Sequence, residues 1–154
     1  MKGGGCLLTM TYYGAEKVVE HYNIMGPIKA ALECVVHYLA AELGSKGIRV
    51  HAISPGPIKT GAGSGIEHFE ELLTQASHRA PMRRAITIED VGNVAVYLVS
   101  DAAAALTGHI VYADAGYHVF WDKPDTVIKS IGLGELPKST VDPRSVRVQK
   151  PMKG

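Results

Sequence analysis

Gly47-Ile48-Arg49-Val50-His51-Ala52-Ile53-Ser54-Pro55-Gly56-Pro57-Ile58-Lys59-Thr60 is the most informative segment of this sequence for predicting its fold. Residues 48–53 alternate apolar side chains with polar or basic ones, which is typical of a strand, and the Pro-Gly-Pro sequence after them predicts a stiff turn. Upstream, residues 6–12 form a nearly continuous apolar run behind three glycines. Such a run indicates a buried strand of a parallel sheet.

The segment between these two strands has the spacing of a helix. Apolar residues recur at helical intervals from Asn23 to Leu43, and Gly44 supplies a stop. Pro27 is compatible with this helix because proline is tolerated in the first turn. Strand, helix and strand together predict a right-handed βαβ unit.

Downstream, the pattern predicts two more helices and a third strand. Residues 66–79 have helical spacing, and Gly61, Gly63 and Gly65 precede them, which makes the approach a candidate mobile lid. Thr87 and Asp90 have the spacing of a capping box that opens a helix ending near Val99. Residues 110–114 form the third strand. The fold class is therefore α/β, a partial doubly wound (Rossmann-like) parallel sheet of about three strands with flanking helices.

Composition excludes several classes of function. The chain has 154 residues, a formal net charge of +1 and a pI near 7.8, so it lacks the basic field of a nucleic-acid-binding protein. Cys6 and Cys34 stand alone, and the seven histidines show no ligand spacing, so we predict no disulfide framework and no metal site. No apolar run has the length of a signal peptide or a membrane span, which favours the cytoplasm.

The last part of the chain differs in character from the rest. Residues 122–154 scatter prolines and basic residues with little periodicity. We expect an extended or disordered tail there, after one folded domain over residues 1–121. Packing of the tail against another subunit is the alternative.

Tyr22 and Lys29 form the most suggestive pair of polar residues. Seven residues on a helix return to within about 20° of the same direction, so the two side chains could act on one substrate. The ammonium of Lys29 could lower the pKa of the Tyr22 phenol, or it could hold a cofactor ribose. The spacing alone is common by chance, and the surrounding sequence gives it meaning.

That surrounding sequence resembles the enoyl-acyl carrier protein reductases, a divergent branch of the short-chain dehydrogenase/reductase family. The resemblance rests on Gly14-Ala15-Glu16-Lys17, on residues 22–33 and 47–60, and on the segments 87–93, 100–108 and 114–117. Most members of the wider family place the lysine four residues after the tyrosine. Here Gly26 occupies that position and the lysine follows at seven, as in the enoyl reductases. The resemblance covers about residues 3–121.

The resemblance implies a role for each of four side chains. Tyr22 corresponds to the tyrosine that hydrogen-bonds the thioester carbonyl and stabilises the enolate. Lys29 corresponds to the lysine that binds the nicotinamide ribose. Tyr12 corresponds to a second tyrosine near the substrate carbonyl, and Met25 falls where the family lines its acyl pocket.

It also implies a cofactor loop, a substrate lid and partners. The cofactor is NADH, held by Lys29 and by the loop residues Pro57, Ile58, Lys59, Thr60, Gly61 and Ala62. Residues 60–80 correspond to the lid, the substrate is an enoyl group carried by acyl carrier protein, and the assembly is a homotetramer. Reduction of the trans-2 double bond of enoyl thioesters in fatty acid biosynthesis is the implied reaction.

The chain departs from the family pattern in one respect. It contains no glycine-rich turn between a strand and a helix, because Gly3-Gly4-Gly5 precedes a strand, so we expect it to lack the N-terminal cofactor-binding half. The first strand should then present a free apolar edge. We expect weak cofactor affinity and little activity from the isolated chain. The alternatives are an inactive fragment or interaction module that associates with a full-length reductase, and a short-chain reductase of another carbonyl or enoyl substrate.

Overall fold

The computed structural model describes residues 3–19, 22–58 and 69–119, and within the last range it describes side chains from residue 73 onward. The predicted tail (122–154) and the first part of the predicted lid lie outside the described residues. Among the described residues, no helix combines the length and the apolar character that spanning a bilayer requires.

A parallel sheet lies at the centre of the described part. Its strands are β1 (Gly5–Met10), β2 (Ile48–Pro55) and β3 (His109–Ala113), in the order β1-β2-β3. Leu8 of β1 pairs with His51 of β2, and Ser54 of β2 pairs with Tyr112 of β3. Because all pairings are parallel, the carboxyl ends of the three strands meet at one edge. The predicted α/β sheet of about three parallel strands is confirmed.

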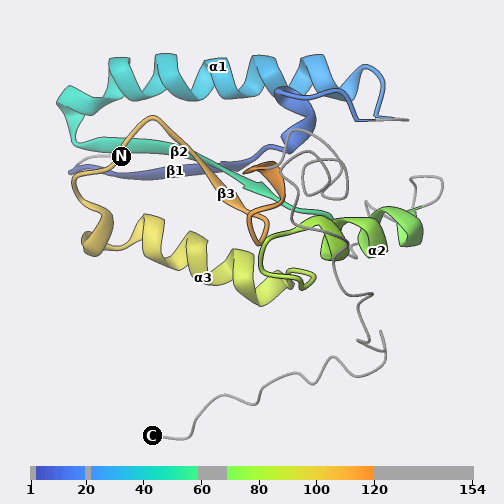
Figure 1. Ribbon diagram of the computed structural model, residues 1–154. Helices are drawn as coiled ribbons and strands as arrows, with labels where there is room; N and C mark the ends of the chain where they lie inside the picture. Colours follow the sequence, from blue (N-terminus) through green and yellow to red (C-terminus); the bar gives the residue numbers. More distant parts are fainter. Residues whose placement is uncertain (1–2, 20–21, 59–68, 120–154) are drawn as a thin grey trace, which may run out of the picture. The chain divides into compact units, whose positions relative to one another are not determined.

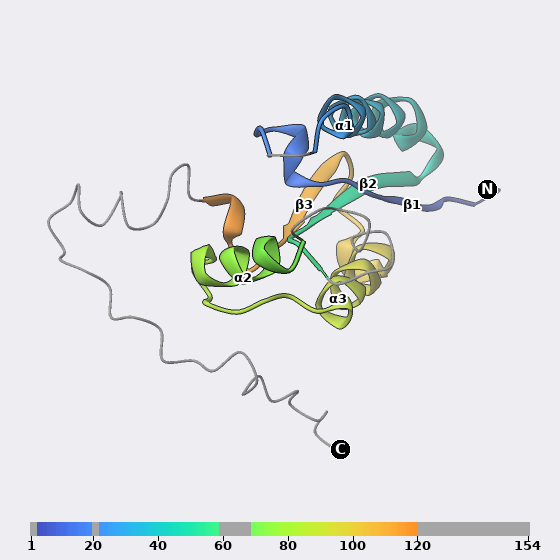
Figure 2. The ribbon, with the colours of Figure 1, turned by 90° about the vertical axis from the view of Figure 1, so that its right-hand side faces the viewer.

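Helices cover both faces of the sheet. Helix α1 (Met25–Leu43) lies on one face and α3 (Ile88–Val99) on the other, as Figures 1 and 2 show from two directions. Two buried clusters fill the layers. The cluster under α1 comprises Val36, Ala40, Ile48, Val50 and Ala52, and the cluster under α3 comprises Ile53, Ile86, Val91 and Leu98. Successive residues of β2 face opposite clusters, which accounts for the burial of nearly the whole strand.

Helix α1 begins two residues later than the sequence predicted. Asn23 has a φ of 46°, in the left-handed region that a right-handed helix cannot include. The chain turns there, and the helix starts at Met25 with Pro27 in its first turn. Tyr22 therefore lies in the approach to the helix, so the argument that placed it and Lys29 on one helical face does not hold.

Both ends of α3 have specific polar partners. At its start, the Thr87 hydroxyl accepts a hydrogen bond from the Asp90 amide (3.1 Å), and the Asp90 carboxylate accepts one from the Thr87 amide (2.9 Å), so the predicted capping box is confirmed. At its end, the guanidinium of Arg49 donates to the carbonyls of Leu98, Val99 (3.3 Å) and Ser100 (3.2 Å). A cation at a helix C-terminus also interacts favourably with the helix dipole.

The alternation in β2 reflects two different buried environments and not a solvated face. The Arg49 guanidinium lies under the end of α3, and His51 is fully buried. Burial, followed by the positive charge of Arg49, lowers the pKa of His51, while the Leu106 backbone acts in the opposite direction. At the other side of the sheet, β1 pairs only with β2 among the described residues, and Leu7 and Met10 are 38% and 42% exposed. The expected apolar edge is present there.

Candidate active site

The residues expected to carry chemistry gather at the carboxyl edge of the sheet. Tyr12 follows β1, the loop of residues 56–58 follows β2, and Asp114 follows β3. Parallel α/β proteins bind ligands at this edge because loops from several strands converge there. The order of the strands therefore brings together segments that are far apart in the sequence.

Tyr12 and Tyr22 are in direct ring contact. Their ring centroids lie 5.0 Å apart with an interplanar angle of 60°. Burial, followed by the neighbouring Tyr117 and Tyr22 phenols, raises the pKa of Tyr12 well above its usual value, and burial raises the pKa of Tyr22. Both phenols therefore keep their protons at neutral pH. They are hydrogen-bond donors, as an oxyanion requires.

Lys29 reaches the same edge from the second turn of α1. Its ammonium donates to the carbonyl of Met10, at the end of β1, over 3.0 Å. The sequence offered two roles for this lysine. Since burial raises the pKa of Tyr22, the structure does not support a lowered phenol pKa. An ammonium has three donors, so the bond to Met10 leaves others that could bind ribose hydroxyls.

Two hydrogen bonds fix the end of β1 beneath the tyrosine pair. The Thr11 amide donates to the carbonyl of Ile53 (2.8 Å), and the buried Thr11 hydroxyl donates to the carboxylate of Glu33 on α1 (2.6 Å). These bonds tie β1 to both β2 and α1. Tyr12 thus extends from a segment that is anchored on two sides.

The Pro-Gly-Pro loop continues β2 along the edge. Gly56 donates its amide to the carbonyl of Ala113 (3.1 Å), and a side chain at this glycine would meet Asp114 at 3.2 Å. Pro57 is buried, and Ile58 packs on the cluster under α3. The remaining residues expected to bind cofactor lie outside the described part, namely Lys59, Thr60, Gly61 and Ala62. Met25, expected in the acyl pocket, is 40% exposed at the start of α1.

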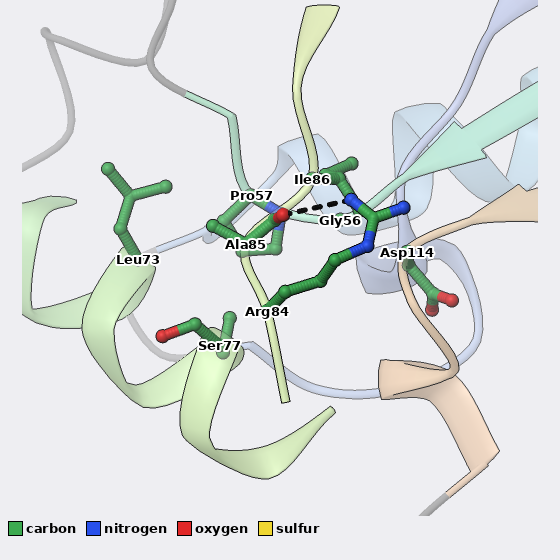
Figure 3. A pocket seen from close by; sticks show the side chains of 9 residues that line it. Gly56, Pro57, Leu73, Ser77, Arg84, Ala85, Ile86 and Asp114 are labelled. Carbon is green, nitrogen blue, oxygen red and sulfur yellow. Dashed lines mark hydrogen bonds between the residues drawn. The ribbon is translucent and has the colours of Figure 1, made fainter. Parts of the chain in front are cut away.

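A pocket lies beside this loop. Figure 3 shows it between the loop, α2 (Phe69–Arg79) and residues 84–86, with Leu73, Ser77 and Asp114 among its lining side chains. None of the residues that line it is Tyr12, Tyr22 or Lys29. The pocket and the tyrosine pair are therefore separate features of the edge.

The sequence reasoning missed a polar cluster at the end of β3. The Tyr112 hydroxyl donates to the carboxylate of Glu16 (2.5 Å), and the ring of Tyr112 stacks on His118 with 3.9 Å between centroids. The His118 ring nitrogen Nδ1 lies 2.9 Å from the buried carboxylate of Asp114. Burial, followed by Glu16, raises the pKa of Tyr112 far above its usual value. Polar residues directly after a parallel strand are the signal that could have indicated it.

The basic residues after α2 are engaged within the protein. Arg84 forms a bidentate pair with Asp90 (2.6 and 3.0 Å), and Arg83 donates to the carbonyl of His78. The guanidinium of Arg79 lies 5.3 Å from the centre of the Tyr117 ring. Within the described ranges, no group of three or more histidine, cysteine or acidic residues has the arrangement of a metal site.

The fold is that of a Rossmann-like α/β protein, because helices cover both faces of a parallel sheet. Phenols, a lysine and a proline-stiffened loop lie at the carboxyl edge of this sheet. The family model described as "Enoyl-(Acyl carrier protein) reductase" matches residues 1–118. The chain therefore belongs to the enoyl-acyl carrier protein reductase family, as the sequence pattern predicted.

Known relatives agree with this assignment. The chain is 56% identical over 118 residues to enoyl-acyl carrier protein reductase (NADH) 1 of Rhizobium meliloti, a match that covers 77% of the chain and 43% of the relative. It is 55% identical to the corresponding NADH enzyme of Rickettsia typhi, over 77% of the chain and 46% of the relative. The chain thus spans less than half the length of these relatives.

Solved structures of enoyl-acyl carrier protein reductases also match the fold of this chain. The enoyl-acyl carrier protein reductase of Bacillus cereus, in complex with NADP+ and indole naphthyridinone, superimposes with a TM-score of 0.76 at 50% identity, covering 78% of this chain and 47% of that one. The reductase of Anaplasma phagocytophilum in complex with NAD gives a TM-score of 0.73 at 50% identity, covering 80% and 45%.

Proposed function

We propose that this chain supplies the catalytic half of an NADH-dependent enoyl-acyl carrier protein reductase, which acts on trans-2-enoyl thioesters in fatty acid biosynthesis. The observation that carries the proposal is the pair of protonated phenols, Tyr12 and Tyr22, 5.0 Å apart at the carboxyl edge of a parallel sheet. The names of the two relatives support NADH as the cofactor, and the description of the family supports a carrier-protein thioester as the substrate.

The residues at this edge fit a nicotinamide nucleotide. Lys29 has donors left for ribose hydroxyls, and the Pro57–Ile58 backbone runs along the same edge, where a carboxamide could bind. Lys59, Thr60, Gly61 and Ala62 would extend the contact along the loop. When bound, the cofactor supplies a hydride.

The protein's own contribution is electrostatic. As the β-carbon of the enoyl thioester is reduced, negative charge develops on the thioester oxygen, and the Tyr22 hydroxyl would donate a hydrogen bond to it. Tyr12 would assist from the adjoining ring. Because burial raises the pKa of both phenols, each would remain a donor throughout the reaction. Met25, exposed beside them, would contact the acyl chain.

Turnover tests this proposal. NADH oxidation is followed at high concentrations of the 154-residue chain with crotonyl thioester, beside the Tyr22→Phe variant. We expect slow turnover, because no glycine-rich diphosphate-binding turn is present in the sequence, and we expect Tyr22→Phe to lower it by about 100- to 1,000-fold. Equal rates in the two proteins contradict the proposal. Comparison of enoyl thioesters with simple carbonyl compounds separates it from a short-chain reductase of another substrate.

A second proposal concerns assembly through β1. This strand lies at the edge of the described sheet with Leu7 and Met10 partly exposed, and such an edge can pair with a strand of another chain. We propose that the chain associates through this edge with copies of itself or with a full-length reductase. Size-exclusion chromatography of the chain alone and mixed with such a reductase decides. Elution as a monomer in both cases contradicts this second proposal.

A further inference from the structure

Two glycines, Gly14 and Gly26, shape the space that the ring of Tyr22 occupies, and we call this space the seat. Gly14 belongs to η1 (Tyr13–Ala15), the short helix after β1, and Gly26 belongs to the first turn of α1. A Cβ atom at Gly14 would lie 2.6 and 2.8 Å from two carbons of the Tyr22 ring and 3.4 Å from the ring of Tyr12. The bare backbone of Gly14 is therefore one wall of the space that Tyr22 occupies.

Gly26 brings the two backbone segments together. A Cβ atom at this position would lie 2.9 Å from the carbonyl oxygen of Gly14, a distance that side-chain carbons do not tolerate. Backbone atoms cannot rotate away as a flexible side chain can. An alanine at 26 would therefore push η1 away from α1. Glycine is a poorer helix former than alanine, so helix stability does not explain glycine at this position.

The turn between the two glycines directs Tyr22 into the seat. Asn23 adopts a left-handed backbone conformation, with φ of 46°, and the Met25 amide donates to the carbonyl of Tyr22 over 3.1 Å. The ring of Tyr22 consequently folds back over η1 and meets Tyr12, at a ring-centroid distance of 5.0 Å.

We propose that Gly14 and Gly26 are positioning residues for the tyrosine pair, and that the absence of side chains at both holds the Tyr22 hydroxyl where it meets the substrate oxygen. This inference rests on the proposed function for its catalytic consequence. Non-bonded carbons approach to about 3.5 Å, and an alanine methyl at Gly14 would lie 2.6 Å from the Tyr22 ring, so the ring would have to move by about 1 Å. A displacement of this size can lower turnover by about 100-fold.

A double-mutant cycle tests the seat without depending on catalysis. In the 154-residue chain, Gly14→Ala is compared in the native background and in the Tyr22→Leu background by thermal unfolding. We expect Gly14→Ala to lower Tm by about 5 °C in the first and by far less in the second, because the overcrowded ring is absent there. Gly44→Ala and Gly92→Ala are the controls, since a Cβ at either position meets nothing within 4 Å.

A spectroscopic readout distinguishes positioning from a general loss of stability. The phenol carbon of Tyr22 is titrated by NMR after labelling of tyrosine Cζ. In Gly14→Ala and in Gly26→Ala the displaced ring loses part of its burial, so the pKa of Tyr22 should fall toward 10, and it should not change in the two controls. Aromatic cross-peaks between Tyr12 and Tyr22 should weaken in the same two variants.

The outcomes separate this inference from the proposed function. An unchanged Tyr22 titration in both seat variants, or an equal Tm loss in both backgrounds, overturns the inference. If Gly14→Ala unfolds the native chain, folding of Gly14→Ala in the Tyr22→Leu background supports the seat, and unfolding there overturns it. Absence of enoyl turnover in the wild-type chain counts against the proposed function only, because neither readout requires cofactor or substrate.

Discussion

Replacement of Arg49 by methionine should destabilise the sheet and α3 together. The guanidinium donates to the carbonyls of Leu98 and Val99, in the last turn of α3 where acceptors lack helical donors, and to those of Ser100 and Ala103 just after the helix. Methionine keeps most of the length and apolar volume of the arginine stem. The substitution therefore removes the charge and its hydrogen bonds with little loss of packing.

The magnitude follows from these contacts. Hydrogen bonds from a charged donor contribute about 1.5–3 kcal/mol, and a cation at a helix C-terminus contributes about 0.3–1 kcal/mol. Arg49 lies partly buried beside Leu98, which is only 1% exposed, so water replaces these bonds incompletely. We expect a loss of about 2–3 kcal/mol in the free energy of unfolding. For a folded part of this size, that corresponds to a fall in Tm of about 8–12 °C.

Urea and thermal denaturation, followed by circular dichroism, measure this effect. Arg49→Lys should recover part of the loss, because it restores the charge but not the forked donor. Lys46→Met is the matched control, since Lys46 is an exposed cation near the start of the same strand. A Tm for Arg49→Met within about 2 °C of that control would show that the Arg49 hydrogen bonds do not stabilise the fold.

Three further substitutions test other contacts. Asp90→Asn should reduce the loss of stability that the protein shows on acidification. The hydrogen bond from Arg84, followed by the other polar contacts, lowers the pKa of Asp90 below 3.8. The ionised carboxylate therefore stabilises the fold above pH 3.8, and this contribution is lost as the pH falls through the pKa of the folded state. Urea midpoints between pH 2 and 7 measure this, and parallel curves for both proteins contradict it. Thr11→Val should cost about 1–2 kcal/mol of unfolding free energy, because it leaves the half-buried Glu33 without its 2.6 Å partner; an unchanged urea midpoint speaks against the bond. Tyr22→Phe should lower enoyl turnover by about 100- to 1,000-fold with a nearly unchanged Tm, and retained turnover would remove Tyr22 from the mechanism.

Much of the fold could be predicted from local patterns. Residues 47–60 defined the central strand and its turn, the helical spacing before them defined α1, and the capping box marked the start of α3 to the residue. These features are local, so the sequence contains their determinants. The start of α1 could not be predicted in the same way, because helical spacing does not indicate that Asn23 adopts a left-handed conformation and that the helix begins after it.

The site depended more on tertiary arrangement. The helical spacing of Tyr22 and Lys29 suggested one face, but Tyr22 precedes the helix, and its partner is Tyr12 at the end of a strand. The contact of Tyr112 with Glu16 joins residues 96 positions apart. No spacing rule indicates such a contact. The burial of His51 likewise depends on α3, which follows it in the sequence and covers its side of the sheet.

Chemical-shift mapping of NADH binding on the isotope-labelled 154-residue chain shows whether the carboxyl edge of the sheet holds the cofactor. If the carboxyl edge binds the nicotinamide end of the cofactor, amide signals of residues 10–12, 22–29 and 55–58 should shift together, with an affinity weaker than micromolar. Signals of residues 44–48, at the opposite edge of the sheet, should stay in place. Shifts confined to that opposite edge, or no shifts at millimolar NADH, would contradict the account.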